Sequence, residues 1–148
     1  MMSMKFKTPA GNKVHICETK WFTFGHKGHY NWFWISVRTY LNTKILLHEM
    51  IHHDQRVRDG LKFIKMLFDM DYLVDNEIEA YLGSGERNAL FMADIISSRY
   101  KVFGIGRLFG FRTNPYNFYE VIEKLRDKVG IDEDGYTSVN LKQEMVWR

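Results

Sequence analysis

The segment His48-Glu49-Met50-Ile51-His52 brings two imidazoles and one carboxylate into a short stretch of chain. In a helix, His48 and His52 project from one face on successive turns, because residues four apart are neighbours there. Two neutral imidazole nitrogens at this spacing suit one tetrahedral zinc ion. Glu49 points about a third of a turn away, where it can reach a metal-bound water without ligating the ion. The spacing therefore predicts a zinc centre ligated by His48 and His52, with Glu49 as the catalytic general base.

Such a centre needs a third ligand, and the histidines of this chain restrict the choice. The six histidines occupy positions 15, 26, 29, 48, 52 and 53, so none lies further downstream. A carboxylate is then the natural candidate, and residues 76–81 offer Glu77 and Glu79. Residues two apart in a helix point to nearly opposite sides, so both cannot face one ion. Glu77 shares a face with Ala80 and could be drawn inward, and the residues alone leave the choice open.

The HExxH segment followed by a Glu-x-Glu-Ala segment resembles the gluzincin-type zinc metallopeptidases. The resemblance is to small forms such as the ImmA/IrrE family and the minigluzincins, and it covers roughly residues 30 to 82. In those proteins the Glu directly before Ala on the second active-site helix is the third zinc ligand. The resemblance thus implies Glu79, which lies 27 positions after His52 (79 − 52). The chain departs from many ImmA/IrrE members at Ile51, where they have Gly, and at Tyr81 and the following Gly-Ser-Gly.

The resemblance also implies a reaction. Bound zinc lowers the pKa of its water towards ~7, and Glu49 accepts the proton and returns it to the leaving amine of a protein or peptide substrate. We expect the strand predicted over 30–39 to pair with an extended substrate.

Several further side chains are candidates for a role at the predicted site. Trp32 and Trp34 suit either subsites or the core, Tyr81 and Tyr100 are candidate oxyanion stabilisers, and Gln55 and Asp59 are candidates to hold a ligand imidazole.

The hydrophobic pattern predicts an α+β fold. We expect a small antiparallel sheet, then the HExxH helix and several packed helices, as in zincin-like proteins. The predicted strands, one of which has Val14 and Ile16 on one face, are Lys13–Glu18, Trp21–Phe24 and Tyr30–Thr39. The motif helix should begin after Asn42 or Thr43 and end before Gly60.

Four further helices are predicted downstream. One spans Leu61–Leu73, with Leu61, Ile64, Leu67 and Phe68 inward, and Asp75 should cap another over Asn76–Leu82. A third should follow Ser84 as far as Tyr100, and a fourth should run from an Asn114 cap to Gly130. Residues 1–148 then form a single domain, with a metallopeptidase core over 1–102 and a helical extension over 103–148.

Composition limits the classes of partner and compartment. The formal net charge of +3 is too small to imply nucleic acid by itself. A single cysteine, Cys17, forms no intramolecular disulfide and favours a reducing compartment. With no signal-peptide pattern and no apolar run of membrane-span length, we expect a cytoplasmic protein with no membrane partner.

Two alternatives remain. The segment 99–119 interleaves Arg99, Lys101, Arg107 and Arg112 with aromatic residues, a pattern typical of weak nucleic-acid contact. The chain would then be a metal-binding, catalytically quiet regulatory or nucleic-acid-associated module. Peptide deformylases also combine HExxH with an upstream cysteine, but Cys17 lacks the residues that surround the cysteine of that family.

Overall fold

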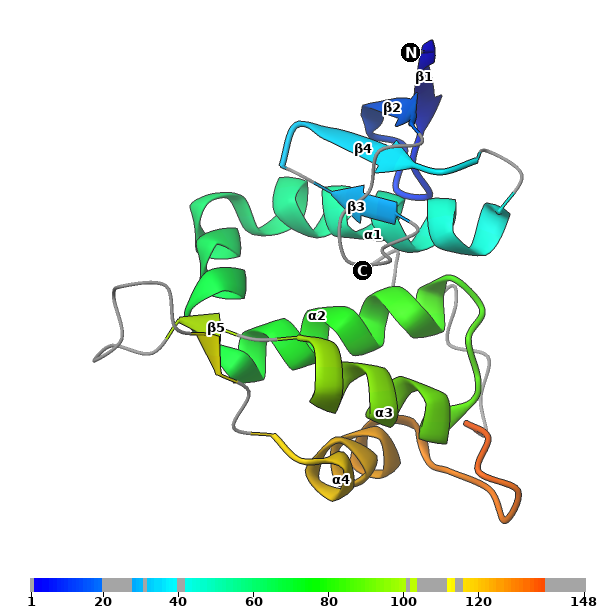
Figure 1. Cartoon of the computed structure of the whole chain (residues 1–148), viewed down its shortest axis with the longest axis vertical. Helices are drawn as coiled ribbons and strands as arrows, with labels where there is room; N and C mark the ends of the chain where they lie inside the picture. Colours follow the sequence, from blue (N-terminus) through cyan, green and yellow to red (C-terminus); the bar gives the residue numbers. More distant parts are fainter. Residues whose placement is uncertain are drawn as a thin grey trace.

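The structure is a computed structural model that describes residues 2–19, 28–30, 32–39, 42–100, 102–103, 112–113 and 116–137. A small sheet and helix α1 form one half, and helices α2, α3 and α4 form the other (Figure 1). In chain order the elements are β1 (Met2–Lys7), β2 (Lys13–Glu18), β3 (Gly28–Tyr30), β4 (Trp34–Val37), α1 (Thr43–Asp59), the 3-10 helix η1 (Gly60–Leu67), α2 (Met70–Gly83), α3 (Ala89–Arg99), β5 (Val102–Phe103), β6 (Arg112–Thr113) and α4 (Phe118–Val129). The predicted α+β class is confirmed.

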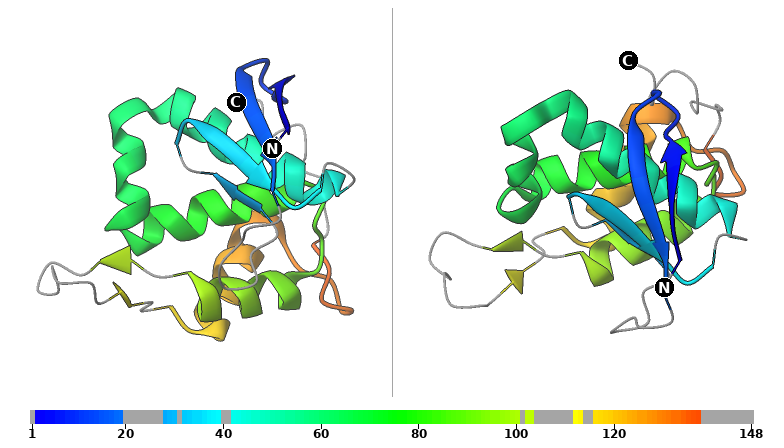
Figure 2. Two further views of the ribbon diagram at one scale, coloured as in Figure 1. Left: turned by 45° about the horizontal axis from the view of Figure 1, so that its top comes forward. Right: turned by 90° about the horizontal axis from the view of Figure 1, so that it is seen from above.

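The main sheet is mixed, so the prediction of an antiparallel sheet is wrong. Its strand order is β1-β2-β4-β3. The pairs β1–β2 and β4–β3 are antiparallel, whereas β2 and β4 run parallel. β4 has a strand on each side, whereas β3 is the last strand in the order. β3 therefore forms one edge of the sheet, and it lies next to α1 (Figure 2).

One face of the sheet is apolar and packs on α1. Val14 and Ile16 of β2 and Ile35 and Val37 of β4 are all buried there, which confirms the predicted alternation in β2. The prediction of one strand over 30–39 is wrong, because two strands are separated by a turn. Trp32 in that turn has a φ of 82°, a backbone conformation that few residues other than glycine adopt. The turn directs Trp32 onto the buried Phe63, with ring centroids 5.2 Å apart.

Helix α1 begins and ends where its sequence predicts. The Asn42 side chain accepts a hydrogen bond from the backbone N–H of Ile45, as an N-cap residue does. Gly60 follows the last turn with a φ of 59°, a conformation that costs glycine little. The six polar residues His48, Glu49, His52, His53, Asp54 and Gln55 are all buried, so α1 is enclosed on more than one face.

The helix predicted over 61–73 is replaced by η1 and the start of α2. Within η1 only Phe63 is buried, and Leu61 and Ile64 are exposed rather than inward. The Asp69 side chain caps α2 by accepting from the backbone N–H of Tyr72. Asp75 therefore lies inside α2 and caps nothing.

The helix predicted to end at Leu82 ends one residue later, since α2 ends at Gly83. The two caps predicted downstream are wrong. Asn88 rather than Ser84 caps α3, and Asn117 rather than Asn114 caps α4. The end of α4 before Gly130 is confirmed.

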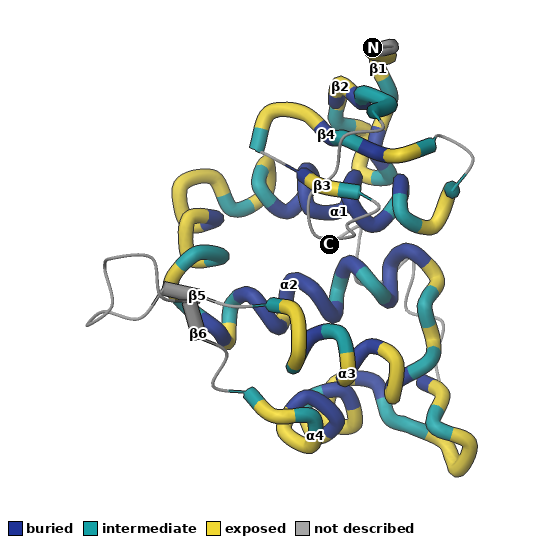
Figure 3. The backbone as a smooth tube through the Cα atoms, viewed as in Figure 1, coloured by how far each residue is buried: buried dark blue, intermediate teal, exposed yellow. Residues whose placement is uncertain are grey.

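Two apolar cores lie on either side of the α1–α2 interface. One joins the sheet to α1 and Phe63, and the other joins α2, α3 and α4 (Figure 3). Met66 of η1 packs against both cores. Between them, Ile51 of α1 and Ala80 of α2 form a small buried contact. None of the described helices is both long and apolar enough to cross a membrane.

Asp54 ties the β1–β2 hairpin to α1. Its carboxylate accepts hydrogen bonds from the Thr8 hydroxyl, from the Ala10 backbone N–H at 3.0 Å and from the Asn12 side-chain amide at 2.8 Å. Asp54 is buried, so these donors take the place of water around its charge. The outer half of the sheet is thereby fixed relative to the helix that carries the HExxH residues.

We predict that Asp54→Ala lowers the free energy of unfolding by about 2–4 kcal/mol, because it strands buried donors in the hairpin turn. Urea unfolding followed by circular dichroism measures the change. The matched control is Asp127→Ala on exposed α4, which should shift stability by no more than about 0.5 kcal/mol. Equal effects of the two substitutions would contradict the anchoring role of Asp54.

Candidate metal centre

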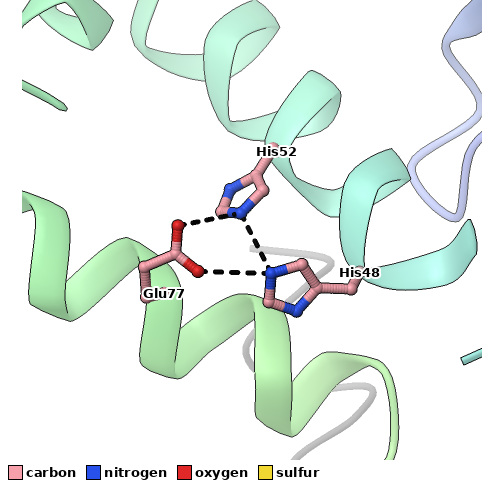
Figure 4. A group of neighbouring side chains, drawn as sticks. All are labelled: His48, His52 and Glu77. Atoms are coloured by element: carbon pink, nitrogen blue, oxygen red, sulfur yellow. Dashed lines mark hydrogen bonds and ion pairs between the residues drawn. The ribbon is translucent and has the colours of Figure 1, made fainter. Parts of the chain in front are cut away.

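Three buried side chains from α1 and α2 converge on one point (Figure 4). The Nε2 atoms of His48 and His52 lie 3.2 Å apart. Glu77 Oε2 lies 3.2 Å from His48 Nε2, and Glu77 Oε1 lies 3.1 Å from His52 Nε2. The HExxH helix therefore supplies two candidate ligand atoms and α2 supplies a third.

This arrangement fits a metal ion. Ligand atoms bound to one tetrahedral ion at about 2.0–2.2 Å lie about 3.4 Å from one another, close to the distances found here. Glu77 Oε2 lies within ion-pair distance of His48 Nε2 but makes no hydrogen bond to any described residue. A buried carboxylate oxygen without a hydrogen-bond partner costs free energy unless a donor or a cation satisfies it. A divalent cation among the three candidate ligand atoms would satisfy this oxygen.

Glu77 occupies the place that the resemblance assigned to Glu79. Glu79 instead pairs with Arg58, whose Nη1 lies 2.8 Å from its Oε1. Ala80 sets the rotation of α2, because it packs on Ile51 at the interface with α1. Glu77, three residues before Ala80, shares that face, whereas Glu79 is rotated away by about 100°. The expectation of Glu79 in the cluster is therefore corrected to Glu77, the alternative that the residues had left open.

Gln55 holds the His52 ring in the orientation and tautomer that a metal requires. Its Oε1 lies 2.8 Å from His52 Nδ1, and an amide oxygen only accepts, so Nδ1 donates. The amide is itself oriented, since Gln55 Nε2 donates to the Asn76 carbonyl at 2.9 Å. In a neutral His52 the lone pair then lies on Nε2, which faces the cluster. Gln55 therefore contacts one of the two predicted ligand imidazoles, and its role in metal binding stays a prediction.

Asp59, the other predicted support for an imidazole, lies elsewhere. Its carboxylate accepts from Arg58 Nε at 3.0 Å and from the Tyr72 hydroxyl at 2.5 Å. These bonds outweigh the effect of burial and hold the pKa of Asp59 below its usual value. Asp59 thus supports the junction of α1 and η1.

The charges in the cluster are strongly coupled. Burial by itself lowers the pKa of His52, but the attraction of Glu77 and its hydrogen bond outweigh burial and raise that pKa well above its ordinary value. Burial raises the pKa of Glu77, but the two histidines outweigh it and hold that pKa far below its usual range. Glu77 is therefore ionised, and without another cation a proton on His52 balances it. A metal ion must displace that proton.

The Glu49 side chain lies on the side of α1 that faces Gly28 of β3. Burial and the charge of Glu77 have larger effects on the pKa values of His52, Tyr81 and Tyr100, but the Glu49 charge is close enough to help raise all three. Strand β3 passes close above it. A Cβ atom on Gly28 would lie 2.6 Å from Ile45 Cγ2 and 3.2 Å from Glu49 Cγ, so a residue with a side chain would clash there. Gly28 thus lets the edge strand approach the predicted general base.

Two phenols complete the surroundings of the cluster. The Tyr81 ring packs on His48 with centroids 4.3 Å apart, and its hydroxyl lies 3.2 Å from that of Tyr100. Burial, followed by the charge of Glu77, raises the pKa of both phenols well above the usual value. Both therefore remain protonated and can donate a hydrogen bond at neutral pH.

The remaining candidates lie apart from the cluster or outside the described residues. His53 points away, as its position predicts, but it is buried rather than at the surface, with Nε2 3.0 Å from the Lys13 carbonyl and Nδ1 3.1 Å from the Tyr30 hydroxyl. Trp32 is partly buried and packs against the core at Phe63, and Trp34 is exposed. Most of the basic-aromatic segment 99–119 lies outside the residues whose side chains are described.

We predict that Glu77→Gln weakens binding of one divalent ion per chain by more than about 100-fold, since loss of a ligand should exceed the 10- to 100-fold effect of a supporting residue. Zinc titration against a fluorescent chelator measures the affinity. Glu79→Gln is the matched control and should bind normally. The reverse pattern would restore Glu79 as the ligand.

We predict that Gln55→Leu weakens metal binding by about 10- to 100-fold while preserving the volume of a buried side chain. Its ¹⁵N signature in NMR should be a loss of the His52 tautomer protonated at Nδ1. Asp59→Asn is the control, because Asp59 contacts neither imidazole in the hydrogen bonds described above. Unchanged affinity in Gln55→Leu would show that the ring is held by packing alone.

Comparison with family models, curated proteins and solved structures finds no match to this chain. Its assignment therefore depends on the geometry of the His48, His52 and Glu77 group, which could hold a metal ion.

Proposed function

We propose that this chain is a zinc-dependent metallopeptidase of the gluzincin type that hydrolyses peptide bonds in a protein or peptide substrate. The observation that carries the proposal is the convergence of the His48, His52 and Glu77 side chains. Glu49 directly follows His48 in the chain and is buried. Two imidazoles and one carboxylate are the donor set of catalytic zinc in one class of hydrolases. Three protein ligands also leave a position open for water and substrate.

When bound, zinc would act as a Lewis acid that acidifies water and polarises a carbonyl group. The residues of the chain account for the other steps. His48, His52 and Glu77 hold the ion, and Gln55 keeps the His52 lone pair directed at it. Glu49 takes the proton of the attacking water and delivers it to the leaving amine.

Tyr81 and Tyr100 are the proposed stabilisers of the oxyanion. Their hydroxyls are adjacent, and Tyr81 packs directly on a ligand imidazole. A neutral O–H donor in a buried site stabilises developing negative charge more strongly than it would in water.

Strand β3 is the proposed docking edge for an extended substrate. The predicted strand over 30–39 cannot serve as a whole, because β4 already pairs with β2 and β3. Among the described residues β3 pairs with β4 alone, and at Gly28 it passes directly over Glu49. A peptide added to this edge would place its backbone next to the predicted general base. The single cysteine accords with action in a reducing compartment such as the cytoplasm.

A catalytically quiet metal-binding module is the second candidate, since the same three ligands would serve it. The two functions differ in turnover, so Glu49 distinguishes them.

We predict that zinc-loaded protein cleaves members of a mixed peptide library and that Glu49→Gln lowers the rate by about 10²- to 10⁴-fold while retaining zinc. Glutamine keeps the shape of the side chain but accepts no proton. New peptide termini, measured by mass spectrometry, report cleavage, and a zinc titration reports the metal. Glu79→Gln is again the matched control. Zinc binding without any cleavage by the natural sequence would favour the quiet module.

A further inference from the structure

The outward side of η1 exposes apolar side chains that neither core uses. In a 3-10 helix residues three apart lie on one face, because each turn contains three residues. Phe63 and Met66 face inward. Leu61 and Ile64 share a second face and are 94% and 51% exposed, and the exposed Lys62 and Lys65 share a third. Leu61, Lys62, Ile64 and Lys65 are called the outer η1 surface below.

Two further exposed apolar side chains flank the outer η1 surface. Val57, one α-helical turn before Leu61, is 48% exposed, and Phe68, directly after η1, is 52% exposed. Single exposed apolar residues are common on soluble domains, but several large ones within one short segment mark a contact surface.

The charge of the surface indicates an anionic partner. Neither Lys62 nor Lys65 forms an ion pair with any residue in the described part of the chain. The nearby acidic groups are already engaged, since Asp59 binds Arg58 and Tyr72, and Asp69 caps α2. The Lys62 ammonium lies 5.9 Å from the centre of the Tyr72 ring. The two lysines therefore present ammonium groups without ion-pair partners among the described residues beside the exposed Leu61 and Ile64, although the charge of Lys62 also acts on Asp59.

The shape of the surface indicates what kind of anionic partner fits. η1 forms the outer corner where the chain turns from α1 to α2, and it projects from the molecule (Figure 3). A projecting corner fits a broad, deformable surface better than it fits a rigid protein groove. A second copy of the chain would bring Lys62 and Lys65 against their own images, and like charges repel. A bilayer with anionic headgroups offers both negative charge and an apolar interior.

We propose that the outer η1 surface docks reversibly on anionic phospholipid membranes. Leu61 and Ile64 enter the boundary between headgroups and acyl chains, and Lys62 and Lys65 bind lipid phosphates and carboxylates. The aliphatic stems of the lysines lie along the apolar boundary while their ammonium groups remain in water. This proposal departs from the expectation of no membrane partner, and it requires neither bound metal nor peptidase activity.

Co-sedimentation with vesicles tests the proposal, with chelator present so that the metal centre plays no part. The natural sequence should bind vesicles of equal parts phosphatidylcholine and phosphatidylserine at least about tenfold more strongly than phosphatidylcholine alone. Added salt should weaken the binding. Leu61→Ser/Ile64→Ser and Lys62→Glu/Lys65→Glu should each abolish it, with unchanged circular dichroism and thermal unfolding.

The matched controls place the same chemical changes elsewhere. Lys5→Glu/Lys7→Glu on exposed β1 repeats the charge change, and Leu90→Ser/Tyr119→Ser removes two other exposed apolar groups. Both controls should bind anionic vesicles normally. The proposal is overturned if the natural sequence does not sediment with anionic vesicles, or if Lys5→Glu/Lys7→Glu fails as completely as Lys62→Glu/Lys65→Glu. It is also overturned if Leu61→Ser/Ile64→Ser binds normally while duplex DNA displaces the vesicles, which would indicate a nucleic-acid surface.

Discussion

The buried carboxylate of Glu77, held between the imidazoles of His48 and His52, is the interaction on which the rest of the structure depends. An ionised carboxylate inside a protein is unfavourable unless opposite charge lies beside it. α2 can therefore bury this side chain only if α1 lies alongside with both histidines turned inward. The Gln55 amide, which joins His52 to the Asn76 carbonyl, fixes the same two helices by a second contact. The same contacts between α1 and α2 therefore form both the candidate site and the interface between the two halves.

Helix α1 meets polar partners on two sides. One side carries His48, His52 and Gln55 towards α2, and the other carries His53 and Asp54 towards the sheet. On the sheet side, Asp54 is satisfied by donors in the turn between β1 and β2. His53 is satisfied by the Lys13 carbonyl of β2 and the Tyr30 hydroxyl of β3. On the α2 side one oxygen and one nitrogen, Glu77 Oε2 and His48 Nδ1, have no hydrogen-bond partner among the described residues. The unsatisfied atoms mark the α2 side as a candidate ligand site, whereas the satisfied contacts on the sheet side are structural.

Local sequence patterns predicted local features well. The Asn42 cap, the end at Gly60, the shared face of His48 and His52 and the support from Gln55 all follow from spacing within one helix. Features set by distant residues could not be predicted in this way. The parallel pairing of β2 with β4 and the burial of His53 by Lys13 depend on tertiary contacts. Glu79 was preferred because it precedes Ala80, but it is the packing of Ala80 on Ile51 that sets the rotation of α2 and turns Glu77 inward.

The 3-10 winding of η1 has a consequence for the spacing of the two ligand-bearing helices. Its eight residues rise about 2.0 Å each instead of 1.5 Å, so the segment is about 4 Å longer than the same residues in an α-helix. η1 runs across the axes of α1 and α2 and joins the end of one helix to the start of the other (Figure 1). Rewinding it as an α-helix would shorten this connection and shift α2, with Glu77, relative to the two imidazoles. The winding of this corner therefore contributes to the separation of the two helices that carry the His48, His52 and Glu77 group, although η1 itself supplies none of these three side chains.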